Sequence, residues 1–442
     1  MFLPAHASAA AFPLRISENG RYLEDQRKEP FLWMGDCPWG LFLQNDAILK
    51  RYLDDRSRRG FTVLQAHLIP ESGLESLSKG FEPFGIPGDL GTPNDRYFDR
   101  VAGVIRYAAG QGLLVQLNPI WIGGGDGGWR EVVKTNGTAK CLDYGKYLGR
   151  KFKRLDNILW LHGGGVDPRP WMGELRSIAE GIRQSAPGHR LHAMQCGSSS
   201  AGRELLLAER WLTIHFTSVP RSETPGPAKG PFGTLFHAKA AYSIDPAVPF
   251  VMGREEVDGG GGTTPRRQRQ DAWWSVLSGA AGYDTSHPSI RWFAEGWEKA
   301  MDEPVLHFAP PLTRLLASFR WQRLVPDFNR AWMPPESGAL EKKSSPAELD
   351  GLAMAADSDG AMLLAYVPEP RGVRIDLSKF RLPVLARWFD PVNGKFSPAV
   401  EGLAEMPNTG VHEFAAPGKN SAGDFDWVLV LDARPNRQPL AK

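Results

Sequence analysis

The chain has 442 residues, 42% of them hydrophobic, with 52 Lys and Arg against 50 Asp and Glu. The formal net charge of +2 gives no electrostatic basis for binding nucleic acid or an anionic membrane. No apolar run approaches the roughly 18 to 20 residues that would span a bilayer. The length exceeds that of one ordinary domain, so we expect a large domain followed by a smaller one.

Strand-like and helix-like segments alternate after a short N-terminal stretch. Residues 1–11 end like the cleavage region of a secretory signal but lack a charged start and a long apolar centre. We interpret them as a signal remnant or a disordered N-terminus and expect a periplasmic or secreted protein, with a cytoplasmic location as the alternative. The apolar runs then predict strands at 31–35, 61–66, 113–118, 158–161, 191–195, 211–217, 249–258 and 280–283. Helical periodicity predicts helices at about 46–59, 94–109, 139–153, 171–184 and 266–277.

Eight strands that alternate with helices are typical of parallel βα units, and eight is the number that closes a barrel. We therefore predict an α/β fold, a (β/α)8 TIM barrel over residues 12–325. Short β runs separated by Asp, Gly and Pro turns follow in the C-terminal region. They predict an antiparallel β-sandwich over residues 326–442.

The ligand site of such a barrel lies at the carboxyl ends of its strands. Polar and aromatic residues follow the predicted strands and form our candidate substrate-binding set: Asp36, Trp39, Gln65, His67, Asn118, Trp121, His162, His215, Asp284 and His287. This mixture suits a carbohydrate, whose hydroxyls need hydrogen-bonding partners while its ring face stacks on an aromatic side chain. Asp36 with Trp39 is equally compatible with a hydrogen-bonded barrel rim, and His215 with a core histidine.

Carboxylates follow the seventh predicted strand and provide the catalytic candidates. Glu255 and Glu256 end the run that begins at Pro249, and four glycines follow from Gly259 to Gly262. No HExxH motif or close His pair supports a metal site, and the three cysteines show no CxxC spacing, so we expect no metal and no other cofactor. The sequence leaves the oligomeric state open.

Several segments carry a family resemblance. They are Trp33-Met-Gly-Asp-Cys-Pro-Trp39, Tyr52-Leu-Asp-Asp-Arg-Ser-Arg-Arg-Gly-Phe61, Asn157-Ile-Leu-Trp-Leu161 and Trp274-Ser-Val-Leu-Ser-Gly-Ala-Ala-Gly282. Together they resemble the apiosidase-like glycoside hydrolases, the DUF4038 group or glycoside hydrolase family 140. Further on, Ala386-Arg-Trp-Phe-Asp-Pro-Val-Asn-Gly394 and Asp426-Trp-Val-Leu-Val-Leu431 resemble the accompanying C-terminal β-domain, which is labelled collagen-binding.

The resemblance implies a (β/α)8 barrel that hydrolyses glycosidic bonds with an Asp after the fourth strand and a Glu after the seventh. Characterised activity in the group concerns apiose linkages in side chains of the pectic polysaccharide rhamnogalacturonan II. The seventh-strand Glu carries over to Glu255, which would be the nucleophile of a retaining mechanism. Arg254 stands where a Gly is usual and Glu256 where a Pro is usual, so a shift of one residue would nominate Glu256 instead.

The fourth-strand acid of the family is missing. Gly163 and Gly164 are followed by Gly165 where the family has Asp, with Pro168 at the expected distance. Asp167 is the nearest substitute, and His162 is another because the ordinary pKa of imidazole suits proton transfer. Two hypotheses remain: a hydrolase acting on an oligo- or polysaccharide with a displaced acid, or a weak or inactive carbohydrate-binding protein on a hydrolase scaffold.

Overall fold

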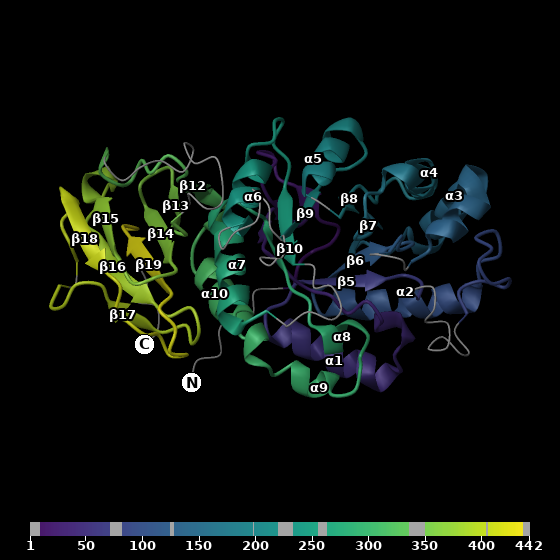
Figure 1. The fold of residues 1–442 in the computed structure, drawn as a ribbon, viewed down its shortest axis with the longest axis horizontal. Coiled ribbons are helices and arrows are strands. Elements are labelled where there is room, and N and C mark those ends of the chain that lie inside the picture. Colours follow the sequence, from purple (N-terminus) through teal and green to yellow (C-terminus); the bar gives the residue numbers. More distant parts are fainter. Residues whose placement is uncertain are drawn as a thin grey trace. The chain divides into compact units, whose positions relative to one another are not determined.

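The computed structural model describes residues 9–70, 82–123, 128–197, 199–219, 233–254, 263–335, 350–403 and 405–435. Its central feature is one sheet of eight strands in the spatial order β8-β7-β6-β5-β4-β11-β10-β9 (Figure 1). The strands are β4 (Trp33–Asp36), β5 (Val63–His67), β6 (Leu114–Asn118), β7 (Ile158–Gly163), β8 (His192–Gln195), β9 (His215–Val219), β10 (Phe250–Arg254) and β11 (Gly282–Asp284).

The sheet curls into a barrel. The pairs from β4 to β8 are parallel, and the register places Gln65 of β5 opposite Gln116 of β6. A parallel bridge between Ala193 of β8 and Ile214, the residue before β9, joins the two ends of the sheet. The predicted (β/α)8 barrel is therefore confirmed, with each of the eight predicted strands within about four residues of an observed one at its start.

Helices follow the strands: α1 (Asp46–Arg58), α2 (Asp95–Gly110), α3 (Arg130–Phe152), α4 (Met172–Ser185), α5 (Ser199–Ala208), α6 (Gly233–Tyr242) and α7 (Pro265–Leu277). Short polar side chains cap the start of three of these helices. The side-chain oxygens of Asn45, Asn94 and Thr264 accept hydrogen bonds from backbone N–H groups of the first turn. Helix α3 begins nine residues before the predicted helix. Gly137 divides it with a φ of 66°, a conformation that glycine adopts easily. Helices α5 and α6 were not predicted.

Smaller elements complete this part of the chain. An antiparallel sheet near the N-terminus contains β1 (Arg15–Ile16), β2 (Leu23–Glu24) and β3 (Pro30–Phe31). After β11 come α8 (Pro288–Arg291), α9 (Trp297–Ala300) and α10 (Ala309–Ala317). Within the described residues, no helix is both long enough and apolar enough to cross a membrane.

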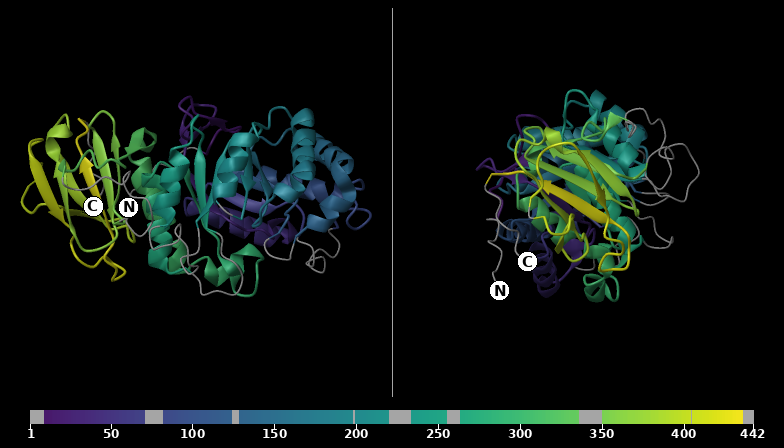
Figure 2. Two further views of the ribbon diagram at one scale, coloured as in Figure 1. Left: turned by 45° about the horizontal axis from the view of Figure 1, so that its top comes forward. Right: turned by 90° about the vertical axis from the view of Figure 1, so that its left-hand side faces the viewer.

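The C-terminal region is antiparallel, as predicted. Six strands form one sheet in the order β12 (Leu324–Pro326), β13 (Ala353–Asp357), β14 (Met362–Val367), β19 (Trp427–Asp432), β16 (Leu385–Phe389) and β17 (Phe396–Pro398). The second sheet pairs β15 (Gly372–Asp376) with β18 (Val411–Ala415). Leu363 and Leu429 of the first sheet share a buried core with Val373 and Phe414 of the second, which makes a β-sandwich (Figure 2).

Contacts divide the chain into two compact units. The first contains Met1–Ser218, Val248–Gly260 and Asp284–Met301, and the second contains Val219–Ala247, Gly261–Tyr283 and Asp302–Lys442. Helices α6 and α7 thus belong to the same unit as the sandwich. The boundary that the sequence predicts at residue 325 stays a prediction.

Candidate active site

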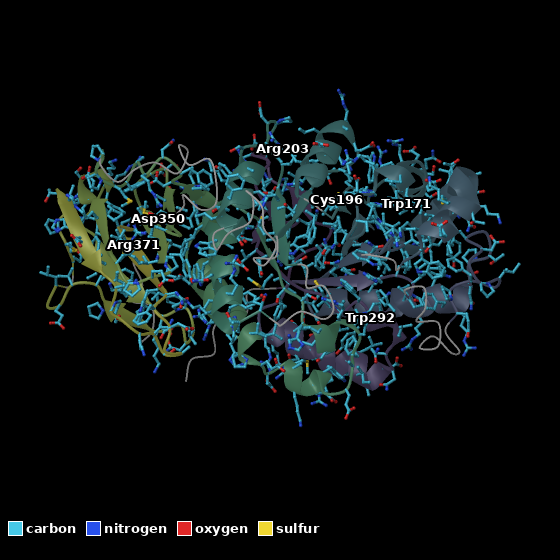
Figure 3. The ribbon with its side chains drawn as sticks, in the orientation of Figure 1. Trp171, Cys196, Arg203, Trp292, Asp350 and Arg371 are labelled. Carbon is cyan, nitrogen blue, oxygen red and sulfur yellow. The ribbon has the colours of Figure 1, made fainter. Side chains whose placement is uncertain are left out.

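Aromatic side chains gather after the carboxyl ends of three neighbouring strands. The ring of Trp39, after β4, is stacked on His67 at the end of β5, with centroids 4.6 Å apart. His67 is stacked in turn on Trp121, after β6, at 4.8 Å. Trp292, which is labelled in Figure 3, directly follows α8 and meets both Trp39 and His67 edge-on at 5.8 Å. We call Trp39, His67, Trp121 and Trp292 the aromatic cluster.

Exposure within the aromatic cluster is uneven. His67 and Trp121 are buried, whereas Trp39 and Trp292 are partly exposed. Flat, partly exposed indole rings over a fixed base are what a sugar ring needs for stacking. The structure therefore brings together three of the predicted site residues, Trp39, His67 and Trp121, in an arrangement suited to a carbohydrate.

A buried arginine supports this cluster. The guanidinium carbon of Arg291 lies 4.3 Å from the ring centroid of Trp39, and its Nη2 donates to the Ser286 hydroxyl at 3.1 Å. Burial lowers the pKa of His67 well below its ordinary value, and the charge of Arg291 lowers it further. His67 is therefore a neutral imidazole near pH 7. Sequence reasoning missed Arg291 and Trp292, although an aromatic residue in the loop after the last strand was a usable signal.

Asp36 is directed at helix α1. Its Oδ2 accepts hydrogen bonds from the Tyr52 hydroxyl at 2.7 Å and from Arg56 Nη1 at 3.2 Å, and all three side chains are buried. These contacts hold β4 against α1. They favour the alternative that Asp36 is a hydrogen-bonded part of the barrel, and its predicted contact with substrate stays untested.

Amides cross the barrel below the aromatic cluster. Gln65 Nε2 donates to Gln195 Oε1 at 3.1 Å, while Gln65 Oε1 lies 3.4 Å from the Cys37 thiol. Asn118 Nδ2 contacts the Gly163 carbonyl at 3.4 Å. The predicted residues Gln65 and Asn118 thus form a buried polar layer under the rim. Gln195 belongs to the same layer and was not predicted.

Asp284 differs from Asp36 because no cationic side chain among the described residues forms an ion pair with it. One carboxylate oxygen accepts a hydrogen bond from Trp33 Nε1. Complete burial, together with the nearby charge of Asp36, raises the pKa of Asp284 to about 7, although the hydrogen bond from Trp33 lowers it in part. Glycine is needed at position 35, since a Cβ there would lie 1.6 Å from Asp284 Oδ1. Asp284 is thus a carboxyl group that is partly protonated at neutral pH.

His162, at the end of β7, belongs to a buried pair of imidazoles. His192 Nε2 lies 3.2 Å from the His189 carbonyl and must donate to it, so His192 Nδ1 accepts from His162 Nε2 at 3.1 Å. Burial lowers the pKa of His162 well below its usual range and that of His192 to about 3. Because His162 is held neutral with its N–H engaged, the geometry does not favour it as the displaced acid.

Close packing requires glycine at the end of β7 and at the position that follows it. Gly163 has a φ of 87°, and a Cβ there would lie 2.3 Å from the Gln195 carbonyl oxygen. A Cβ on Gly164 would lie 2.7 Å from the Gly123 carbonyl oxygen. Gly165 is partly exposed. Close backbone packing therefore requires glycine at the first two positions, and the expected place of the family's acid at position 165 stays a prediction.

Asp167 is tied to its neighbour Arg169. Arg169 Nη2 lies 2.6 Å from Asp167 Oδ2, and both side chains are about half exposed. The hydrogen bond from Arg169 lowers the pKa of Asp167 below its ordinary value. A general acid must carry a proton, so this pairing opposes donation by Asp167.

The remaining predicted residues are placed as follows. His215 is buried near Gly202 of α5, whose Cβ would lie 3.5 Å from its ring, and burial lowers the pKa of His215 to about 4. His287 caps helix α8 by accepting the Ser289 N–H at 3.2 Å. Glu255 and Glu256 lie outside the described residues, and β10 ends at Arg254. Within the described residues, no group of three or more His, Cys, Asp or Glu side chains could hold a metal ion.

An eight-stranded parallel barrel followed by a sandwich is the architecture of known glycoside hydrolases. A solved structure named "Glycoside hydrolase" matches with a TM-score of 0.78 and 21% identity, covering 97% of this chain and 99% of that one. A glycoside hydrolase family 5 structure from Bacteroides vulgatus also matches with a TM-score of 0.78 and 21% identity, covering 97% of this chain and 96% of that one. A comparison with curated proteins finds no match.

Models of two known protein families match the sequence of this chain. The model described as "Apiosidase-like, catalytic domain" matches residues 17–323, and the model described as "Putative collagen-binding domain of a collagenase" matches residues 332–432. The chain therefore belongs to the apiosidase-like family of glycoside hydrolases, as the motifs indicated.

Proposed function

We propose that the protein hydrolyses glycosidic bonds in oligo- or polysaccharide side chains, of the pectic rhamnogalacturonan type by resemblance, with Glu255 as the nucleophile. The observation that carries the proposal is the aromatic cluster, because Trp39 and Trp292 are partly exposed aromatic residues at the edge of the barrel where ligands bind. Family membership and the position of Glu255 directly after β10 support it. A periplasmic or secreted location would suit such a substrate.

The chemistry needs two carboxyl groups. The Glu255 carboxylate attacks the anomeric carbon, the bond from that carbon to the leaving oxygen breaks, and a protonated acid transfers its proton to that oxygen. Water then attacks the glycosyl-enzyme intermediate, gives its proton to the conjugate base of the acid, and releases Glu255. The aromatic cluster would hold the sugar ring during both steps.

The acid is the demanding part of this mechanism. Asp36 is engaged by Arg56, whereas Arg169 lowers the pKa of Asp167 and so favours its ionised carboxylate. Asp284 is partly protonated but buried. Asp167 remains our candidate for the displaced acid, on the condition that bound substrate separates it from Arg169.

The ion pair between Asp167 and Arg169 also favours a second function. Without a protonated acid near Gly165, the scaffold would bind a glycan through the aromatic cluster and release it unchanged. This alternative is a carbohydrate-binding protein with weak or no turnover.

Hydrolysis assays with pectic oligosaccharides and aryl glycosides distinguish the hydrolase from the carbohydrate-binding protein. We would compare the natural protein with Glu255→Gln, Glu256→Gln and Gly165→Asp. Activity that Glu255→Gln abolishes and Glu256→Gln retains supports a hydrolase with a displaced acid. Binding without turnover in the natural protein, with turnover gained in Gly165→Asp, supports the binding protein. Loss of activity in Glu256→Gln alone would indicate that Glu256, and not Glu255, is the nucleophile.

A further inference from the structure

A groove lies between helices α1 and α2, which are neighbours on the barrel (Figure 1). It holds a cavity of about 620 Å³, within the range of about 300 to 1,000 Å³ that is typical of small-molecule sites. Its apolar floor consists of Leu49 and Leu53 from α1 with Tyr97 and Val104 from α2, all of them buried. Both helices belong to the first compact unit. We call this cavity the helix groove.

The charged residues that line the helix groove are mostly cations. They are Lys50, Arg96 and Arg100, with one carboxylate, Asp46. Arg100 Nη1 lies 2.9 Å from Asp46 Oδ1, so this carboxylate already has a cationic partner. Lys50 and Arg96 are exposed, and no ion pair among the described residues engages either of them. The groove therefore presents two cations beside an apolar floor, which suits a ligand that carries negative charge.

Acidic residues on the same two helices are engaged away from these cations. Asp95 and Asp99 of α2 pair with Lys151 of α3 at 2.7 and 2.8 Å. Asp54 lies two turns beyond Asp46 along α1, where its Oδ1 accepts a hydrogen bond from the Tyr107 hydroxyl at 2.6 Å. Positive charge is thus concentrated at the end of the groove where both helices begin.

A glycine keeps the middle of the helix groove open. Gly103 lies in the interior of α2, where glycine is less favourable than alanine. A Cβ at this position would meet no atom within 4 Å. Because Gly103 lines the groove, a large side chain there would occupy the cavity without displacing the helices.

Hydrogen bonds tie the charged end of the groove to the loops that carry the aromatic cluster. Arg100 Nη2 donates to the carbonyl of Gln44, in the loop that follows Trp39. The Tyr97 hydroxyl donates to the Leu68 carbonyl at 2.6 Å, and Leu68 directly follows His67. The helix groove and the aromatic cluster are therefore joined through the loops after β4 and β5.

We propose that the helix groove is an accessory binding site for the uronate-bearing part of an acidic oligosaccharide. Lys50 and Arg96 pair with uronate carboxylates, while the apolar floor and the partly exposed Tyr107 ring contact the C–H faces of the sugar rings. The choice of an acidic glycan rests on the proposed function, because a pectic substrate is rich in galacturonate. The groove raises the local concentration of such a chain near the aromatic cluster and takes no part in bond cleavage.

Calorimetric titration of the full chain with tetragalacturonate tests the site, with the neutral methyl ester of the same oligosaccharide as the second ligand. Lys50→Gln combined with Arg96→Gln removes the two cations. Arg106→Gln combined with Lys153→Gln is the matched control, because it removes two exposed cations that do not line the groove. Gly103→Trp fills the groove, and Gly103→Ala is its control, since a methyl group meets no atom there.

We expect the loss of Lys50 and Arg96 to weaken tetragalacturonate binding about threefold to tenfold, as for two exposed ion pairs. Binding of the methyl ester should not change in this variant. Gly103→Trp should weaken both ligands, whereas Gly103→Ala and the matched control should bind like the natural protein. Equal losses in the matched control, or unchanged affinity in both the cation variant and Gly103→Trp, would overturn the site.

Hydrolysis of a small neutral aryl glycoside separates this inference from the proposed function. The variant without Lys50 and Arg96 should keep the natural kcat and KM on this substrate, because it carries no uronate. Hydrolysis of the aryl glycoside without any binding of tetragalacturonate would overturn the accessory site and leave the hydrolase intact. Binding that Gly103→Trp abolishes, in a protein that hydrolyses no glycoside, would support the accessory site and contradict the proposed hydrolase.

Discussion

The two halves of the barrel rim are built differently. Around β4, β5, β6 and β11, the strand ends lead into the aromatic cluster, with Trp39 and Trp292 partly exposed. Around β7, β8 and β9, His162 and His192 pair with each other and His215 is buried near α5. Strand-end residues of the same chemical type therefore join a partly exposed aromatic cluster on one side and pack in the interior on the other.

Two carboxyl groups at the strand ends of the first half also have different contacts. Asp36 faces α1 and finds Arg56, whereas Asp284, on the adjacent strand, contacts Trp33 and crowds Gly35. Two strand-end carboxyl groups thus lie in different surroundings, one beside a cation and one beside an indole N–H.

The largest effect we expect comes from Arg56→Met, which leaves Asp36 buried without its cation. Breaking a buried ion pair costs about 3 to 5 kcal/mol of unfolding free energy. Urea denaturation measures this cost. Arg51→Met is the control, because its pair with Glu298 is exposed and is expected to contribute less than about 1 kcal/mol. Similar costs for both variants would show that Asp36 does not depend on Arg56.

Asp284→Asn tests the opposite carboxyl group. The folded-state pKa of about 7 lies above the unfolded value, so Asp284 favours folding at low pH and this contribution is lost as pH rises through about 7. Between pH 5 and pH 8 the natural protein should lose about 3 kcal/mol of unfolding free energy relative to Asp284→Asn. Parallel stability profiles over this pH range would contradict an uncompensated buried carboxyl.

Trp39→Ala tests the ligand side of the comparison. Removing a stacking face should weaken oligosaccharide binding about tenfold, which corresponds to about 1.4 kcal/mol. Calorimetric titration measures it, and Trp39→Phe should retain most of the affinity. Trp211→Ala is the control from the other half, because that ring packs edge-on against His162 at 5.0 Å. Equal losses in Trp39→Ala and Trp211→Ala would remove the distinction between the halves.

The smallest effect concerns Arg169→Ala. Without the guanidinium, the pKa of Asp167 should rise toward its ordinary value, which NMR titration of the carboxyl group detects. If Asp167 is the acid, a raised pKa keeps it protonated to higher pH, so the alkaline limb of the rate profile moves upward. An unmoved limb alongside a shifted carboxyl titration would exclude Asp167 as the proton donor.

The sequence predicts the barrel well because its strands are apolar runs that end at polar residues. Helix α6 was missed because its own residues are mostly small or apolar and do not form a distinct polar face. Its sequence is Gly233-Thr-Leu-Phe-His-Ala-Lys-Ala-Ala-Tyr242. The aromatic cluster was predictable in Trp39, His67 and Trp121, each at or just after a strand end. The partners of Asp36 and Asp167 could not be predicted from the sequence. Their contacts depend on the direction of each side chain, which is known only once the strands, helix α1 and the turn after β7 are placed.

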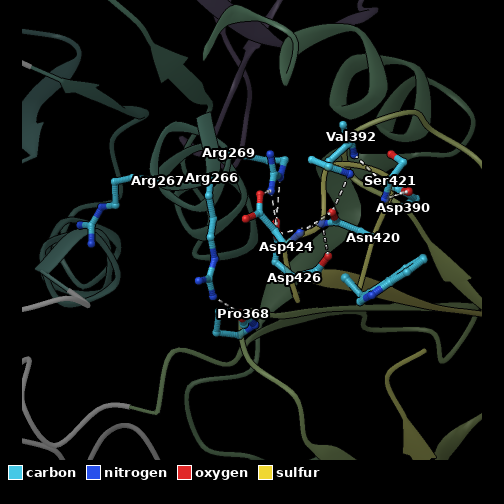
Figure 4. Close-up of polar contacts among 12 residues, drawn as sticks. Arg266, Arg267, Arg269, Pro368, Asp390, Val392, Asn420, Ser421, Asp424 and Asp426 are labelled. Atoms are coloured by element: carbon cyan, nitrogen blue, oxygen red, sulfur yellow. Dashed lines mark hydrogen bonds and ion pairs between the residues drawn. The ribbon is translucent and has the colours of Figure 1, made fainter. Parts of the chain in front are cut away.

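Helix α7 is joined to the sandwich by ion pairs from Arg266 to Glu369 and from Arg269 to Asp424 and Asp426 (Figure 4), and these contacts determine how such proteins can be recombined. A chimera that joins this barrel to a relative's sandwich near residue 325 would place Arg266 and Arg269 opposite foreign side chains. A fusion that also transfers residues 263–277 with the sandwich would keep each arginine with its own acid. The exchangeable module is therefore discontinuous in the chain, and the C-terminal domain alone is the wrong unit to transplant.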